Sequence, residues 1–195
     1  LYFALQYANP QTITAFVGLG LLAILAAIAY TVGKKPYGYM GLGDLSVFLF
    51  FGWVGTFGTY YLQTEILNYY ILIPASGCGF LSVAVLNLNN LRDLENDRKT
   101  GKNSIPVRIG KTYGFYYQKT IMLLGVCTFI IYLMYQGKPI QLSQNIIIMA
   151  GWYPLVQIIK QLNSKMTPAQ IDPYLKKTAL STLFLIVIFG VSQIF

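Results

Sequence analysis

The chain has 195 residues and a formal net charge of +8, but only 10% of its residues are charged and 55% are hydrophobic. Ordinary soluble domains carry roughly 25% charged residues, so this composition argues against a soluble domain and favours an integral membrane protein. With no His in the chain and only 2 Cys, any metal site is expected to use oxygen ligands, which suit hard cations.

Six apolar runs approach or reach the length that crosses a bilayer. A membrane helix needs about 20 apolar residues, and lipid cannot satisfy free backbone groups, so each run is predicted to be an α-helix. In chain order the runs are Thr12–Thr31, Leu45–Gln63, Tyr69–Asn87, Thr120–Gln136, Gln144–Ile159 and Thr178–Phe195. The predicted fold is an all-α, polytopic membrane helix bundle, with one domain over residues 1–195. Residues 1–8 are too few for a span, and we expect them to be the end of an earlier helix in a longer protein.

Basic residues gather in alternate connections, which predicts the orientation of the bundle. Lys34 and Lys35 follow the first run, residues 92–111 follow the third, and four lysines from Lys160 to Lys177 follow the fifth. Because basic loops face the cytoplasm, we expect a multi-pass protein of the cell (inner) membrane with these three loops on the cytoplasmic side. The positive charge therefore indicates how the chain is oriented in its lipid bilayer. No nucleic-acid partner is expected, because the basic residues are interleaved with membrane spans.

The first basic loop contains Lys35 and Tyr37 and leads to Asp44. Lys35 and Tyr37 are candidates for substrate contact if this loop faces the acidic segment that follows the third run. The alternative, and the commoner use of such residues, is that the lysine sets topology and the tyrosine anchors the membrane interface. Asp44 is predicted to cap the second run.

Three of the chain's 6 acidic residues lie in one segment, residues 89–102, NNLRDLENDRKTGK. Asn89, Asp93 and Asp97 follow one another at intervals of four residues. Their side chains therefore share a face if the preceding helix continues through them. Two carboxylates and an amide oxygen suit Mg²⁺, which completes its shell with water and substrate phosphates. The segment is therefore a candidate magnesium site.

The same segment carries more cations than its carboxylates need for neutralisation. Arg98 and Lys102 are among them, Arg108 follows shortly after the segment, and such donors could hold a diphosphate and stabilise its charge as it departs. The alternative is a solvated face of mixed charge, which acidic spacing alone does not exclude.

The third basic loop is predicted over Asn163–Lys177, because Pro168 and Pro173 are expected to interrupt any helix there. Asp172 has no acidic partner at helical spacing and is interpreted as a turn or cap residue.

Two segments resemble the UbiA-type intramembrane aromatic prenyltransferases, in particular the members that act on 1,4-dihydroxy-2-naphthoate. They are NLNNLRDLENDRKTGKNSIPVRIG and GKKPYGYMGLGDLSVFLFFGWVGTFGTYYLQT, and they stand in the order and at the distance found in the family. The resemblance covers essentially the whole chain and identifies its six runs as the fourth to ninth helices of the family's nine. The family's first acidic motif would precede residue 1, so we expect the 195-residue chain alone to be inactive.

This resemblance implies a reaction and assigns roles to residues. It implies Mg²⁺-assisted ionisation of a polyprenyl diphosphate, followed by attack of the ring of 1,4-dihydroxy-2-naphthoate and loss of CO₂, which gives demethylmenaquinone. It also favours a role for the loop of Lys35 and Tyr37 in recognising the aromatic substrate. The implied site residues are Asp93, Asp97 and Asn89 for the metal, and Arg98, Lys102 and, less directly, Arg108 for the diphosphate.

Two alternatives stay open. One is a UbiA-type transferase that acts on another aromatic acceptor, and the other is a cation-handling membrane transporter in which Asp93 and Asp97 guard an entrance. A transporter is expected to carry ionisable groups at mid-membrane depth, and the predicted runs contain almost none.

Overall fold

The computed structural model describes residues 9–33, 36–136 and 142–193, with the backbone alone described over 142–148. Every regular element in these ranges is helical, which confirms the all-α prediction. In chain order the elements are α2 (Pro10–Thr31), η1 (Tyr37–Met40), α3 (Gly43–Val47), the π-helical η2 (Phe48–Phe57), α4 (Gly58–Thr64), η3 (Tyr69–Ile71), α5 (Leu72–Arg92), α6 (Leu94–Lys99), α7 (Ile105–Tyr135), α8 (Leu142–Gln161) and α9 (Pro168–Ser192).

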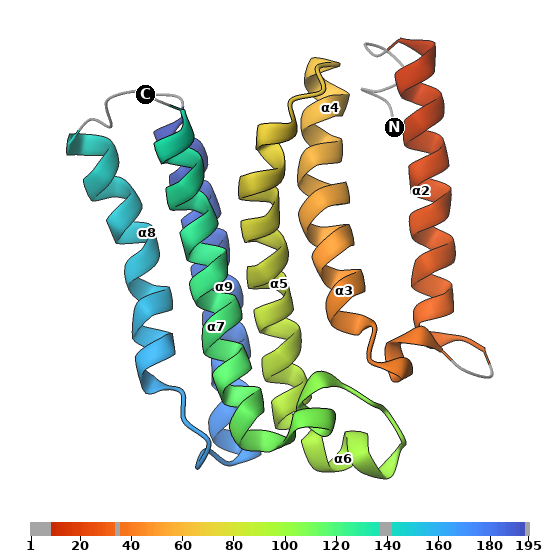
Figure 1. Ribbon diagram of the computed structural model, residues 1–195, viewed down its shortest axis with the longest axis vertical. Helices are drawn as coiled ribbons and strands as arrows, with labels where there is room; N and C mark the ends of the chain where they lie inside the picture. Colours follow the sequence, from red (N-terminus) through yellow and green to blue (C-terminus); the bar gives the residue numbers. More distant parts are fainter. Residues whose placement is uncertain (1–8, 34–35, 137–141, 194–195) are drawn as a thin grey trace.

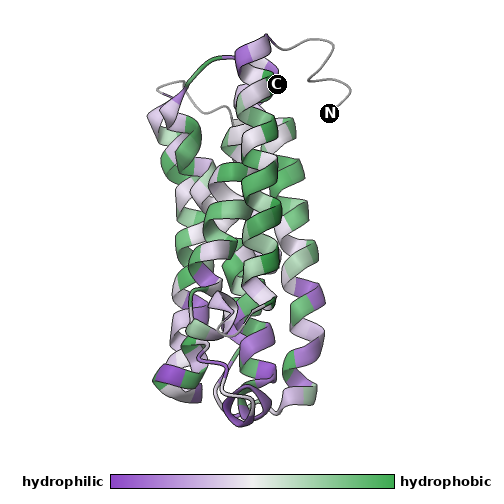
Figure 2. Cartoon of the chain, turned by 90° about the vertical axis from the view of Figure 1, so that its right-hand side faces the viewer, coloured by the Kyte–Doolittle hydropathy of each residue, from purple (hydrophilic) through white to green (hydrophobic). Residues whose placement is uncertain are grey.

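Five stretches within the described ranges are long and apolar enough to cross a membrane. They are α2, the continuous stretch Gly43–Thr64, Tyr69–Arg92, α7 and α9. The fifth predicted run, Gln144–Ile159, lies within α8, which is helical but is not one of the five, so the predicted count of six spans is not confirmed. The helices stand side by side (Figure 1), and their hydrophobic middles lie at similar heights (Figure 2).

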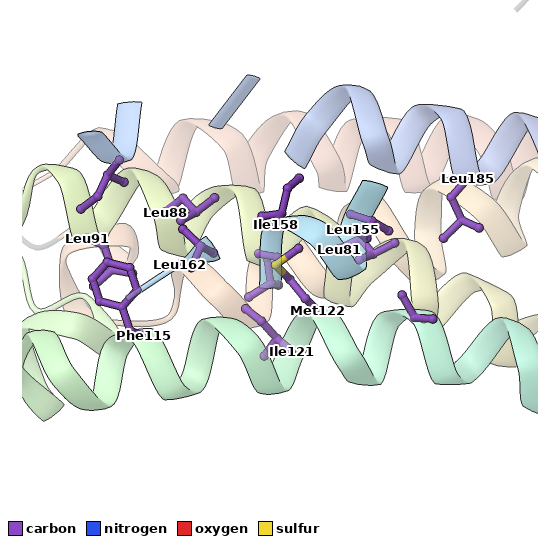
Figure 3. Close-up of a cluster of buried hydrophobic side chains, with 14 of the residues drawn as sticks. Leu81, Leu88, Leu91, Phe115, Ile121, Met122, Leu155, Ile158, Leu162 and Leu185 are labelled. Atoms are coloured by element: carbon purple, nitrogen blue, oxygen red, sulfur yellow. The ribbon is translucent and has the colours of Figure 1, made fainter. Parts of the chain in front are cut away.

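The buried core is formed by α5, α7, α8 and α9, with α5 packed on α7 and α9 and α8 packed on α9. Leu81 and Leu88 of α5 are fully buried beside Met122 of α7, Leu155 of α8 and Leu185 of α9 (Figure 3). Lipid is as apolar as these side chains, so close packing, more than the escape from water, stabilises such a core inside a membrane.

Small residues allow α5 and α7 to approach each other closely. A Cβ added to Gly77 would lie 2.6 Å from the Phe129 ring, and one added to Gly125 would lie 2.7 Å from Leu81. The two glycines therefore face the opposite helix across the contact, in keeping with the small residues found where membrane helices pack.

Three connections meet at one end of the bundle, the lower end in Figure 1. The backbone N of Asn103, after α6, donates to the Tyr39 carbonyl of η1 at 2.9 Å. Lys111 Nζ donates to the Met166 carbonyl, between α8 and α9, at 2.7 Å. Figure 2 shows hydrophilic residues gathered at this end. These contacts confirm that the connections predicted to be basic loops lie on the same side of the bundle.

The prediction of a loop over Asn163–Lys177 is wrong, because α9 already begins at Pro168. A proline in the first position of a helix loses no hydrogen bond, since its N–H would have no partner there. Thr167 and Gln170 form a reciprocal capping box, in which the Thr167 N–H donates to Gln170 Oε1 at 2.8 Å. Pro173 lies inside the helix near this end, and the helix continues through it.

α7 also begins earlier than predicted, at Ile105 instead of Thr120. Its first turn contains Pro106 and is separated from the long helix by Gly110, which has φ 83° and ψ 162°. Glycine adopts this conformation without the steric cost that a side chain would bring. The short first turn therefore leads the chain from the charged end of the bundle into the membrane-spanning part of α7.

Gly77→Ala tests the α5–α7 contact. We expect it to lower the free energy of unfolding by about 2 kcal/mol, because the added methyl group overlaps Phe129 and must push the helices apart. The measurement is thermal or denaturant unfolding in detergent. Gly18→Ala is the matched control, because nothing lies within 4 Å of its added Cβ, and it should be neutral or stabilising. Equal losses in the two variants would contradict the close packing.

Candidate active site

The acidic segment begins where α5 ends. α5 stops at Arg92, the chain bends at Asp93 (φ −93°, ψ 11°), and α6 begins at Leu94. The Asp93 N–H still donates to the Asn89 carbonyl at 3.0 Å, and the Asp97 N–H donates to the Asp93 carbonyl at 2.8 Å. The backbone thus keeps a helical spacing, but α5 does not continue through the segment as one helix. The side chains of Asp93 and Asp97 bind different partners.

Arg92 joins Asn89 and Asp93. Its Nε lies 2.8 Å from Asp93 Oδ1, and its Nη2 lies 3.0 Å from Asp93 Oδ2 and 2.7 Å from Asn89 Oδ1. The guanidinium hydrogen bonds hold the pKa of the Asp93 carboxyl below its usual value. A carboxylate oxygen and an amide oxygen therefore converge on one cationic nitrogen. Hard oxygen donors around a positive point are also what Mg²⁺ requires, so this pair of residues fits the predicted metal.

Arg92 also reaches α9. Its Nη1 lies 2.7 Å from Asp172 Oδ1, so the interpretation of Asp172 as a turn or cap residue is wrong: it lies inside α9 and forms an ion pair. The sequence offered no signal for this pair, because the two residues lie 80 positions apart and belong to no common motif.

Asp97 is held separately from Asp93. Its side chain is buried, and its Oδ2 accepts from Lys102 Nζ at 3.0 Å and from Ser104 Oγ at 3.3 Å. Lys102 Nζ also donates to Asn90 Oδ1 at 2.9 Å. Lys102 thus neutralises a buried carboxylate. Within the described ranges, no three acidic or Cys side chains come together as a ready-made metal site.

The other two predicted diphosphate residues differ in their freedom. Arg98 pairs with Glu95 at 3.1 Å on an exposed face. Arg108 donates from Nε to the Asn103 carbonyl at 3.0 Å and also hydrogen bonds the Met40 carbonyl. Arg108 therefore holds the η1 turn against the segment that follows α6.

The first basic loop faces the acidic segment through these contacts, but its side chains also have structural partners. The Tyr37 hydroxyl donates to the Ala26 carbonyl at 2.9 Å and lies 3.1 Å from Ser46 Oγ, so it links α2 to α3. Lys35 lies outside the described residues. Asp44 is not the predicted cap: it lies in the first turn of α3 and accepts a hydrogen bond from Tyr117 of α7 at 2.8 Å.

Two hollows are lined in part by residues at or near this end of α5. A cavity of about 410 Å³ is lined by Arg92, Asp93, Lys99 and Lys111, among others. A mostly apolar groove of about 470 Å³ runs between η2, α5 and α9, with Asn89 in its lining. The cavity could bind the charged group of a ligand, and the groove could bind an apolar chain.

Comparisons with known proteins show which family the chain resembles. The model of the UbiA prenyltransferase family matches residues 3–171. Three relatives are named 1,4-dihydroxy-2-naphthoate octaprenyltransferase: the Haemophilus influenzae protein is 52% identical over 126 residues (65% of this chain, 41% of the relative), the Escherichia coli protein 48% over 123 (62% and 40%), and the Mycobacterium tuberculosis protein 41% over 118 (60% and 40%). The matches thus span about two fifths of these relatives. No solved structure matches the chain.

Lys102→Met tests whether Lys102 has a structural role in addition to any contact with substrate. We expect a loss of about 3 kcal/mol in the free energy of unfolding, because Asp97 would remain buried without its cation. Lys99→Met removes a charge from the same segment at an exposed position and should cost less than about 0.5 kcal/mol. Equal unfolding midpoints for both variants would refute the structural role.

Asp93→Asn tests the ion pair with Arg92 through its pH dependence. The folded-state pKa of Asp93 lies below its ordinary value because of the Arg92 hydrogen bonds, so the ionised carboxylate stabilises the fold above the ordinary pKa, and the effect is lost as pH falls through the lowered pKa. We expect the wild type to exceed the variant by about 1 kcal/mol at pH 7, because the pair is partly exposed. The difference should shrink below about pH 4. In an Arg92→Gln background this pH-dependent difference should disappear, and its persistence would contradict the assigned cause.

Proposed function

Because the chain belongs to the UbiA prenyltransferase family, we propose that its protein transfers a polyprenyl group from polyprenyl diphosphate to 1,4-dihydroxy-2-naphthoate. The products are demethylmenaquinone, diphosphate and CO₂. The names of the three bacterial relatives support this choice of acceptor. The observation that carries the proposal is that Asn89, in the lining of an apolar groove, and Asp93, in the lining of a charged cavity, turn their side-chain oxygens toward the same nitrogen of Arg92 at the end of α5.

The two hollows suit a substrate that is part lipid and part anion. Phe51, Leu86 and Leu175 help to line the groove between η2, α5 and α9, which supports a role in holding the isoprenoid chain. Arg92, Lys99 and Lys111 line the charged cavity and would attract the diphosphate. The lipid bilayer supplies the isoprenoid substrate from the sides of the bundle, and the charged end is proposed to face the cytoplasm.

We assign Asn89, Asp93 and Asp97 to the metal. Bound Mg²⁺ would neutralise the diphosphate as its bond to the allylic carbon breaks. Arg98 is exposed beside this segment, which favours its role as a diphosphate donor, and Lys102 would reach the diphosphate only by giving up part of its contact with Asp97.

Arg108 and Tyr37 form hydrogen bonds with neighbouring parts of the fold, so we propose that they position the first basic loop. Arg108 holds the η1 turn through the Asn103 and Met40 carbonyls, so we assign it to positioning this turn beside the diphosphate, and its predicted direct contact stays a prediction. The first basic loop, whose sequence contains Lys35 and Tyr37, is proposed to recognise the aromatic acceptor. The electron pair of the acceptor ring forms the new bond to the allylic carbon, and the ring carboxyl group leaves as CO₂.

The direct test is an assay of the full-length protein in membranes with Mg²⁺, polyprenyl diphosphate and 1,4-dihydroxy-2-naphthoate. We expect demethylmenaquinone and CO₂, and a loss of at least about 100-fold in kcat for Asp93→Ala and for Asp97→Ala. Glu65→Ala is the control, because Glu65 is an exposed acidic residue at the end of α4 whose carboxylate accepts from the Asn9 N–H at 2.8 Å, away from the charged cavity, and it should keep activity within about twofold.

Two results would overturn parts of the proposal. Full activity in both aspartate variants would remove their assigned roles. Prenylation of a different aromatic acid, with none of 1,4-dihydroxy-2-naphthoate, would leave the family membership intact and replace the acceptor.

A further inference from the structure

We propose that Arg92 is a positioning residue that competes with the metal for Asn89 and Asp93, and that Asp172 holds the guanidinium when the metal displaces it. Arg92 and Asp172 thereby set the metal affinity of the site. This inference rests on the proposed function, because it concerns the metal ligands assigned there.

The competition follows from the contacts of one nitrogen. Arg92 Nη2 lies 2.7 Å from Asn89 Oδ1 and 3.0 Å from Asp93 Oδ2, and Nε takes the other oxygen of Asp93 at 2.8 Å. The guanidinium therefore contacts every side-chain oxygen that these two residues offer. Mg²⁺ binds oxygens at about 2.0–2.1 Å, so it would occupy the region in which these N–H groups now lie.

Arg92 cannot make room by losing its proton, because a guanidinium stays charged in proteins. Two positive charges this close repel each other, so the side chain must turn away when the metal binds. Its own helix already places it at the end of α5, where the side chain is partly exposed and has space to move.

Asp172 is placed to receive the displaced guanidinium. It belongs to α9, and it already accepts from Arg92 Nη1 at 2.7 Å through Oδ1. Among the hydrogen bonds and ion pairs of the described residues, Arg92 is its side-chain partner. Turning about this contact lets Arg92 release Asn89 and Asp93 while its charge stays paired. A carboxylate can accept two N–H groups of one guanidinium, so the pair with Asp172 can become bidentate.

The two residues therefore affect metal binding in opposite directions. Arg92→Gln removes the competing charge, and we expect it to tighten binding of Mn²⁺ by about tenfold. Asp172→Asn removes the alternative partner, makes Arg92 harder to displace, and should weaken Mn²⁺ binding by about threefold. In the Arg92→Gln background, Asp172→Asn should have no further effect, because nothing remains for it to hold.

The experiment measures Mn²⁺ binding to the full-length protein in detergent, from the electron paramagnetic resonance signal of free Mn²⁺. Lys176→Gln matches Arg92→Gln in charge at an exposed position of α9, and Glu65→Gln matches Asp172→Asn in charge at an exposed position at the end of α4. Both controls should change the affinity by less than about twofold, since their charges are exposed and screened. Asp172 is itself exposed, so its variant is expected to fold even if Arg92→Gln does not.

The outcomes separate this inference from the proposed function. Mn²⁺ binding by the wild type with equal shifts in each variant and its control would overturn the inference and leave the metal site in place. Additive effects in the double variant would also overturn it. Absence of Mn²⁺ binding by the wild type, and by Arg92→Gln, would remove the metal site and this inference with it.

Discussion

The packing of α5 against its neighbours determines where everything else at the charged end lies. Gly77 and Gly125 let α5 and α7 approach each other, and the buried face of α5 also meets α9 and η2. Because α5 is fixed on these sides, its last turn places Asn89 in the lining of the apolar groove. Asp93, the first residue after α5, lies in the lining of the charged cavity. Lipid provides no water to fill poor contacts, so small residues and tight packing must supply this rigidity.

Charge compensation is the second constraint. The acidic segment lies at the end of membrane helices, where an unpaired carboxylate or ammonium group that is withdrawn from water is costly. Each of its aspartates therefore has a cation from the same segment: Arg92 for Asp93 and Lys102 for Asp97. A metal and a diphosphate together would bring opposite charges to this place, so exchange of partners within the segment preserves neutrality. The surplus of basic residues in and beside the acidic segment would likewise neutralise the charge of an anionic ligand.

Much of the fold follows from local properties of the sequence, and the errors have identifiable causes. The length of each apolar run predicts a membrane helix, and the basic residues in alternate connections predict that these connections lie on one side. Both properties can be read from short stretches of sequence. The helix boundaries depend on the exact position of each proline: Pro168 is predicted to interrupt a helix, but in the first position of α9 it is compatible with one. The shared face of Asn89, Asp93 and Asp97 requires α5 to continue through them, and residue spacing cannot reveal that the chain bends at Asp93.

The sequence by itself determined that this chain forms membrane helices and that its acids and bases gather at one segment, because hydropathy and charge along the chain are enough for both. It also suggested the family, through two motifs. Only the tertiary structure decided which charges meet. Arg92 and Asp172 pair because α5 and α9 pack together, and Tyr117 reaches Asp44 because α7 lies near the start of α3. Such contacts depend on how distant helices are arranged in space, and no local spacing encodes that arrangement.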